Sequence, residues 1–172
     1  ISVEYLKKKG ISFKACVYES LDELLSNQEK KDFEKLVGVN HSLLQTVKQC
    51  KATISYPPSG LPMLLYGPTG TGKSLIAKLT YEWARNHEII AKDGQFVQVN
   101  CSEYANNPEL LTANLFGHVK GAFTGAEKDN EGLIALADNG VLFLDEVHEL
   151  KAECQEKLFL FMDQGIYHRV GD

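Results

Sequence analysis

The sequence predicts an α/β fold in which a parallel sheet carries helices on both faces. Three short apolar runs, at residues 61–66, 96–100 and 141–144, are each followed by a stretch with helical periodicity. Strands that alternate with helices are joined by crossover connections, which make the sheet parallel and cover both of its faces. With 172 residues, of which 44% are hydrophobic and 24% charged, the chain is long enough for one globular domain of this class.

The N-terminal part, residues 1–34, carries no recognisable motif. Residues 11–18 alternate apolar and polar side chains, which favours a half-buried strand, and Ser20 followed by Glu23 is typical of a helix start. Because the chain opens on Ile1 rather than on Met, we expect a domain from a longer protein. Residues 1–34 are then a linker or the tail of a preceding domain, with a boundary in the charged stretch 27–31, and residues 35–172 form the core.

The periodicity of the core predicts its helices in order. A helix that begins after residue 32 and ends at the Pro-rich turn 56–60 has an apolar face at Leu43, Leu44, Val47, Cys50 and Ile54. After the run 61–66, a second helix has Leu75, Ile76, Leu79 and Trp83 on one face. A helical region through Leu115 follows 96–100. The last helix follows 141–144 and carries Leu158, Phe159, Phe161 and Met162.

Charge and cysteine usage exclude several classes of protein. The net charge of −5 gives the chain no overall attraction for nucleic acid, so DNA contact would need another part of the protein. The four cysteines stand alone without a CxxC pair, which favours a reducing, cytoplasmic compartment. Neither the cysteines nor the histidines have the spacing of metal ligands. No apolar run approaches the roughly 20 residues that cross a bilayer.

A glycine-rich turn between the run 61–66 and the following helix satisfies the phosphate-loop (Walker A) pattern G-x-x-x-x-G-K-[ST]. It comprises Gly67, Pro68, Thr69, Gly70, Thr71, Gly72, Lys73 and Ser74. Such a loop points backbone N–H groups at phosphate oxygens, and the helix N-terminus adds partial positive charge. We expect Lys73 to reach the β- and γ-phosphates of a nucleotide and the Ser74 hydroxyl to bind Mg²⁺.

Two carboxylates end the apolar run 141–144. Asp145 and Glu146 should therefore lie at the carboxyl edge of the sheet, where ligands bind in open α/β folds. Taken alone, such a pair could simply cap the next helix, but together with the phosphate loop it resembles a Walker B segment. Asp145 is expected to hold Mg²⁺, directly or through water, and Glu146 to orient and polarise an attacking water.

A third motif reads GAFTGA, in which a single aromatic residue is surrounded by small ones. Such a segment is either a flexible loop or a Gly-rich turn with Phe123 tucked into the core. All six residues match the signature of the bacterial enhancer-binding ATPases of the AAA+ class, and the chain resembles this family from about residue 36 to Asp172. In the family this loop projects and contacts sigma-54. Carried over, the sigma-54 contact loop comprises Gly121, Ala122, Phe123, Thr124, Gly125 and Ala126, with Phe123 and Thr124 as the residues that make the contact.

The resemblance implies further roles. Finer features are similar to the subgroup typified by the levanase operon regulator. Asn100 matches the family's switch asparagine, which hydrogen-bonds the catalytic Glu, although a strand-end Asn can simply start a turn. Val37 and Gly38 match the adenine pocket. Asn114 and Val119 depart from the usual Glu residues near the base of the loop.

The family pattern also implies cofactors, partners and a missing strand in the sheet. ATP and Mg²⁺ would be the cofactors of an ATPase acting in a ring of subunits on sigma-54 RNA polymerase, with DNA bound by a domain outside this chain. The family's sensor I strand, arginine fingers and lid would follow Asp172, so we expect weak nucleotide binding and poor hydrolysis by the chain alone. Without that strand, either the run 61–66 pairs directly with 141–144 or another segment, such as 11–18, fills the gap.

Two other functions remain open on the sequence. A nucleotide-binding interaction module would use ATP only to order the GAFTGA loop. A generic phosphate-loop enzyme such as a kinase would share both nucleotide motifs but has no role for that loop.

Overall fold

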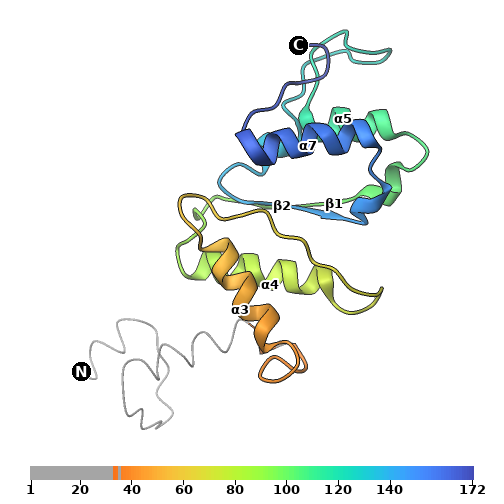
Figure 1. Ribbon diagram of the computed structural model, residues 1–172. Helices are drawn as coiled ribbons and strands as arrows, with labels where there is room; N and C mark the ends of the chain where they lie inside the picture. Colours follow the sequence, from red (N-terminus) through yellow and green to blue (C-terminus); the bar gives the residue numbers. More distant parts are fainter. Residues whose placement is uncertain (1–32, 35) are drawn as a thin grey trace. The chain divides into compact units, whose positions relative to one another are not determined.

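The computed structural model describes residues 33, 34 and 36–172 (Figure 1). The chain divides between Leu36 and Val37, and every labelled helix and strand belongs to the unit from Val37 to Asp172. The strand expected over 11–18, the helix start expected at Ser20 and the boundary expected at 27–31 lie outside the described residues.

In the described residues the elements follow the predicted order except that no strand separates the first two helices, and short 3₁₀ turns follow both strands. Their order is α3 (Leu44–Ile54), α4 (Lys73–Asn86), β1 (Phe96–Asn100), η1 (Cys101–Tyr104), α5 (Pro108–Phe116), α6 (Gly132–Leu136), β2 (Val141–Asp145), η2 (Val147–Glu149) and α7 (Ala152–Gln164). The first helix begins at Leu44, later than the periodicity suggested, because residues 37–43 form turns. The short helix α6 was not predicted.

The two strands pair in parallel, as expected. Phe96 lies opposite Val141 and Asn100 lies opposite Asp145, so both strands end at the same edge of the sheet. Successive side chains of a strand point to opposite faces. Phe96 therefore meets Tyr81 of α4, with ring centroids 5.3 Å apart, while Val99 packs into the core on the other face.

The strand predicted over 61–66 does not form, which corrects the sequence analysis. Among the described residues the sheet has two strands, β1 and β2, and residues 61–66 run without ladder pairing. Leu64 is 78% exposed and Tyr66 is 98% exposed. A strand exists only where its backbone groups meet a partner strand, and β2 pairs with β1 alone in this part of the chain. Of the two alternatives for the missing strand, direct pairing of 61–66 with 141–144 is therefore wrong, and the segment 11–18 lies outside the described residues.

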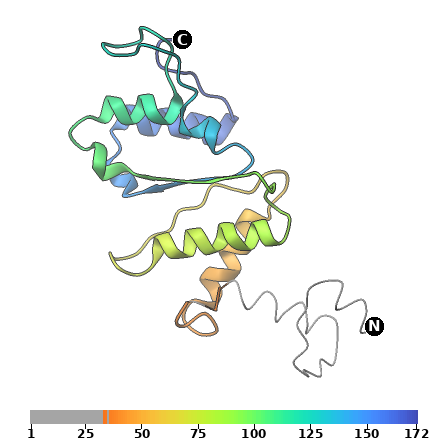
Figure 2. The ribbon, with the colours of Figure 1, turned by 180° about the vertical axis from the view of Figure 1, so that it is seen from behind.

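Helices cover both faces of the sheet, which confirms the predicted layers. In Figures 1 and 2, α3 and α4 lie on one side of the strands, and α5 and α7 lie on the other. The core between the strands and the α5 and α7 layer is formed by Val99, Cys101, Leu111, Leu115, Phe116, Ile134, Leu150 and Cys154. On the other side, Ile76, Leu79 and Trp83 are buried, together with Val47 and Cys50 of α3.

Three predicted helix faces are narrower than expected. Leu44 of α3 is 40% exposed and Leu75 of α4 is 43% exposed, while Phe159 and Met162 of α7 are 64% and 40% exposed. In α7 the inward stripe comprises Cys154, Leu158 and Phe161, at the spacing of one helix face, and Phe159 lies on the neighbouring stripe. An apolar residue next to the stripe therefore stays at the surface.

Candidate functional site

The phosphate loop has the backbone that its glycines permit. Gly70 and Gly72 have φ values of 81° and 86°, in the left-handed region that other residues rarely adopt. Helix α4 begins at Lys73, directly after Gly72. The loop thus leads into a helix N-terminus, whose free N–H groups and partial positive charge suit an anion.

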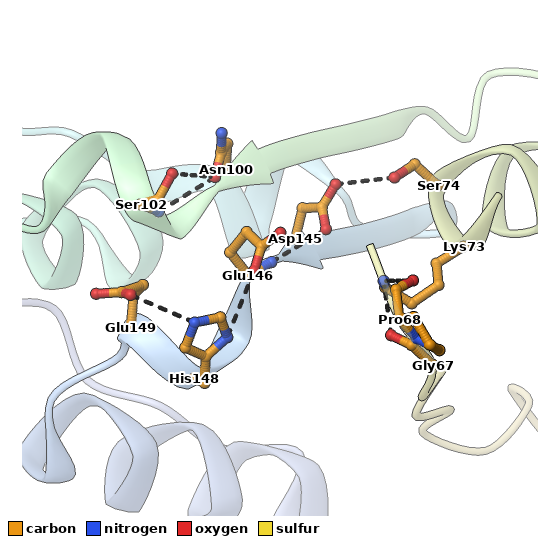
Figure 3. Close-up of polar contacts among 10 residues, drawn as sticks. All are labelled: Gly67, Pro68, Lys73, Ser74, Asn100, Ser102, Asp145, Glu146, His148 and Glu149. Carbon is orange, nitrogen blue, oxygen red and sulfur yellow. Dashed lines mark hydrogen bonds and ion pairs between the residues drawn. The ribbon is translucent and has the colours of Figure 1, made fainter. Parts of the chain in front are cut away.

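Lys73 lies over its own loop. Its Nζ donates hydrogen bonds to the carbonyl oxygens of Gly67, at 3.0 Å, and Pro68, at 3.1 Å (Figure 3). The Thr71 hydroxyl also donates to the Pro68 carbonyl, at 2.8 Å. The ammonium group is therefore held at the loop by weak, neutral acceptors, which a phosphate group could replace with charged ones.

The deciding contact joins the loop helix to the end of β2. The Ser74 hydroxyl donates a hydrogen bond to Oδ2 of Asp145 at 2.8 Å, although the two residues lie 71 positions apart. A hydroxyl and a carboxylate oxygen are hard ligands of the kind that Mg²⁺ takes, usually together with waters and phosphate oxygens. The residues predicted to hold Mg²⁺ are thus brought together, and their chemistry fits that ion.

Glu146 follows Asp145 at a sharp turn of the backbone. Its φ of 52° is positive, which is unusual for a residue with a side chain, and its N–H donates to Oδ1 of Asp145 at 3.1 Å. Its Oε2 lies 3.5 Å from Nδ1 of His148. Figure 3 shows the Glu146 side chain directed toward His148, with Ser74 on the other side of Asp145.

Asn100 reaches the same sheet edge but has local partners. Its Oδ1 accepts hydrogen bonds from the backbone N–H of Ser102, at 3.1 Å, and from the Ser102 hydroxyl, at 2.9 Å. It thereby caps η1, which is the turn-starting role that a strand-end Asn can take. Within the described residues, the hydrogen bond expected between Asn100 and Glu146 is not made, because the cap holds the side chain with its amide nitrogen, the only group that could donate to a carboxylate, turned away from Glu146 (Figure 3).

Among the residues that the structure describes, Val37 and Gly38 make no contact that marks a nucleotide-base pocket. Val37 is 97% exposed. The Gly38 carbonyl accepts hydrogen bonds from the N–H groups of His41 and Leu43, both at 2.9 Å. The structure therefore places this pair in a local turn, and its expected role stays a prediction.

The GAFTGA loop is closed by its own backbone. The N–H of Gly121 donates to the Ala126 carbonyl at 2.9 Å, and the N–H of Ala126 donates to the Phe123 carbonyl at 3.0 Å. The Phe123 ring packs against the His118 ring, with centroids 4.9 Å apart, and is 40% exposed. Phe123 is thus at the surface rather than in the core, and rests on the base of the loop.

The base of the loop is tied to the C-terminal segment. The N–H of Val119 donates to the Val170 carbonyl at 3.1 Å, and the N–H of Val170 donates to the Gly117 carbonyl at 2.9 Å. The Asp129 side chain accepts from the Lys120 N–H at 2.7 Å. None of these contacts was predicted, and the two backbone bonds to Val170 join segments about 50 residues apart in sequence.

The cysteines near the site are neutral thiols. Burial raises the pKa of Cys101, which follows Asn100, to about 11, with further contributions from Cys154 and Asp145. Burial also raises the pKa of Cys154. These thiols belong to the core rather than to the nucleotide chemistry.

A comparison with protein families gives a match along most of the chain. The family described as "Sigma-54 interaction domain" matches residues 36–172. This chain belongs to that family. In the sigma-54 interaction domain formed here, the phosphate loop, the Asp145 and Glu146 pair and the GAFTGA loop all fall within the matched residues.

Individual relatives agree with this assignment. The chain is 49% identical over 139 residues to the transcriptional regulatory protein LevR of Bacillus subtilis, which covers 81% of the chain and 15% of LevR. It is 38% identical over 144 residues to a Nif-specific regulatory protein of Herbaspirillum seropedicae, covering 84% of the chain and 25% of that protein. The chain thus spans a small part of each relative.

The fold is found in a solved structure. A crystal structure of NtrX from Brucella abortus is similar with a TM-score of 0.58 and 24% identity, covering 98% of this chain and 33% of NtrX. This likeness supports the α/β architecture. In the described residues, no helix is long and apolar enough to cross a membrane.

Sequence reasoning missed His148. It lies two residues after Glu146 and contacts two carboxylates through both ring nitrogens. The signal was the short spacing to Glu146, but only the turn at Glu146 brings the side chains together.

Proposed function

We propose that this domain binds ATP with Mg²⁺ and is the ATPase core of a sigma-54-dependent transcriptional activator. The observation that carries the proposal is the 2.8 Å hydrogen bond between Ser74 and Asp145, which brings the two predicted nucleotide motifs to one point. Membership in the sigma-54 interaction domain family supports it.

The residues have distinct roles in this proposal. The N–H groups of residues 67–74 and the Lys73 ammonium hold the phosphates, and Ser74 and Asp145 hold Mg²⁺. The bound metal supplies charge neutralisation on the phosphate oxygens. Glu146 accepts a hydrogen bond from the attacking water and aligns it. The amide nitrogen of Asn100 is a candidate donor to Glu146 once the cap of η1 opens and the side chain turns.

The GAFTGA loop is the proposed contact with sigma-54. Phe123 is surface-exposed and lies on a loop closed by only a few backbone hydrogen bonds, so the loop can change position at small cost. The proposal further includes assembly into a ring of subunits, a cytoplasmic location and DNA binding by another domain. It takes residues 1–34 as a linker or the tail of a preceding domain. We expect the chain alone to hydrolyse ATP poorly.

The test is binding of purified sigma-54 to the chain with and without a transition-state analogue of ATP. Binding that requires both the analogue and Phe123 supports the proposal, with Phe123→Ala as the variant and Phe159→Ala, on the exposed stripe of α7, as the control. Nucleotide binding without any effect on sigma-54 would instead favour a generic phosphate-loop enzyme. Analogue-dependent binding without turnover, even in the longer protein, would favour an interaction module.

A further inference from the structure

The turn after β2 folds three side chains toward one another. Glu146 has φ 52° and ψ 44°, and the 3₁₀ turn η2 follows it at once. The N–H of Glu149 donates to the Glu146 carbonyl at 3.0 Å, and the next residue, Leu150, is buried in the core with 4% exposure. A buried residue at the end of a tight turn fixes the turn in place. The side chains of Glu146, His148 and Glu149 therefore start from a defined backbone.

His148 stands between two carboxylates. Its Nδ1 lies 3.5 Å from Oε2 of Glu146, and its Nε2 lies 3.3 Å from Oε1 of Glu149 (Figure 3). The His148 side chain is 69% exposed and the Glu146 side chain 40% exposed. Exposed contacts of this kind add little to folding stability. A role in orientation explains the arrangement better than a role in stability.

We propose that His148 is a positioning residue for Glu146. This inference rests on the proposed function, in which Glu146 aligns the attacking water. A donor at Nδ1 engages Oε2 and leaves Oε1 of the same carboxylate available to a water. Without the imidazole, no donor lies between the carboxylates of Glu146 and Glu149. Their repulsion would then move the Glu146 side chain out of the single orientation that aligns the water.

Asn100 does not perform this task in the structure, because the cap of η1 keeps its amide nitrogen, the group that could donate to a carboxylate, turned away from Glu146 (Figure 3). His148 is the side chain that contacts the Glu146 carboxylate in the described part of the chain, and it comes from the same turn. Its position thus depends on η2 and not on the η1 cap. Glu146, the candidate water-aligning residue, is therefore contacted by a side chain from its own turn, which runs from Glu146 to Leu150.

The first arm of the test needs no nucleotide. NMR spectra of the ¹⁵N-labelled chain at one fixed pH resolve the two ring nitrogens of His148, which are assigned by their loss in His148→Asn. Glu146→Gln is expected to shift the Nδ1 resonance more than the Nε2 resonance, and Glu149→Gln to do the reverse. An Nδ1 resonance that is the same in the wild type and in Glu146→Gln would overturn the proposal.

The second arm measures a single turnover of ATP with Mg²⁺ and the chain in excess, alongside nucleotide affinity. His148→Ala is expected to slow the turnover about tenfold at unchanged affinity, less than the roughly hundredfold that a 1 Å misplacement can cost, because Glu146 itself is retained. His148→Asn, whose amide takes the place of Nδ1, should retain most of the rate. His148→Gln, whose amide takes the place of Nε2, should behave like His148→Ala. His168→Ala controls for loss of an exposed histidine.

The two arms separate the failure of this inference from that of the proposed function. A wild-type chain that binds no ATP defeats the proposed function, and the NMR arm then decides the His148 contact by itself. A wild-type chain that turns over ATP while His148→Ala does so at the same rate defeats the positioning role alone. A rate that falls equally in His148→Asn and His148→Ala would also contradict it, because it would show that a donor at Nδ1 is not what matters.

Discussion

The Ser74 hydroxyl donates a hydrogen bond of 2.8 Å to the Asp145 carboxylate. Ser74 lies on α4, directly after the phosphate loop, and Asp145 ends β2. The contact fixes the distance between the loop that would hold phosphates and the sheet edge that carries the carboxylates. Removing the hydroxyl in Ser74→Ala should cost about 1 kcal/mol of folding stability, because a half-buried hydrogen bond is lost. The same variant should weaken ATP binding in the presence of Mg²⁺ by about tenfold, equal to about 1.4 kcal/mol.

Calorimetric titrations of the chain with ATP, once in Mg²⁺ and once in a chelator, show whether Ser74→Ala weakens ATP binding through the metal. The loss of affinity should be confined to the Mg²⁺ titration, since the hydroxyl acts as a metal ligand. An equal loss in both titrations would show that Ser74 supports the loop and does not bind the metal.

Two phenylalanines distinguish the surface loop from the core. Phe116 is 1% exposed, whereas Phe123 is 40% exposed and rests on His118. Phe116→Ala should lower the free energy of unfolding by about 3 to 5 kcal/mol, as large core truncations do. Phe123→Ala should cost about 1 kcal/mol, the value of one aromatic contact. Urea unfolding of both variants tests this, and similar losses would mean that Phe123 is a core residue after all.

Glycines at two places in the loop region have different costs of substitution. A Cβ at Gly132 would lie 2.4 Å from the Gly117 nitrogen, whereas a Cβ at Gly125 meets nothing within 4 Å. Gly125→Ala should cost about 1 to 2 kcal/mol from its positive φ alone. Gly132→Ala adds a backbone collision and should cost about 3 kcal/mol or more. Thermal unfolding of the two variants in parallel measures the difference, and equal melting temperatures would contradict the close packing of α6 on the end of α5.

Alkaline pH should destabilise the fold through Cys101. Burial raises the pKa of this thiol from 9.0 to about 11, so the unfolded chain releases its proton at lower pH than the folded chain does. The contribution to stability is intact below pH 9.0, and falls as the pH rises from there to about 11. Urea unfolding across this window should show a steeper loss of stability in the wild type than in Cys101→Ala. The same slope in both proteins would place the titrating group elsewhere.

The sequence predicted best what is local. β1 was found to the residue because the short apolar run 96–100 and the helical stretch after it carry the signal, and the phosphate loop and the Asp145 and Glu146 pair were located from spacing alone. The extended run 61–66 failed as a strand because strand formation depends on a partner that the run itself does not encode. Helix α6, with 5 residues, is too short to show a period.

Contacts that depend on backbone turns could not be predicted from the sequence either. The cap of η1 by Asn100 is a local alternative to its expected partner, and both choices fit a strand-end asparagine. His148 meets Glu146 only because Glu146 adopts a left-handed conformation, which favours glycine and asparagine and is not signalled by a glutamate. The docking of Phe123 on His118 likewise follows from the closure of the loop.

The most direct measurement is the affinity of the chain for ATP with Mg²⁺, in the wild type and in two lysine variants of α4. Lys73 lies at the phosphate loop, and Lys78 is exposed on the same helix. We predict binding by the wild type, an unchanged affinity in Lys78→Ala and a loss of about tenfold or more in Lys73→Ala, since one charge-assisted contact to phosphate is removed. Equal affinities in Lys73→Ala and the wild type, or no binding by the wild type, would contradict the nucleotide site.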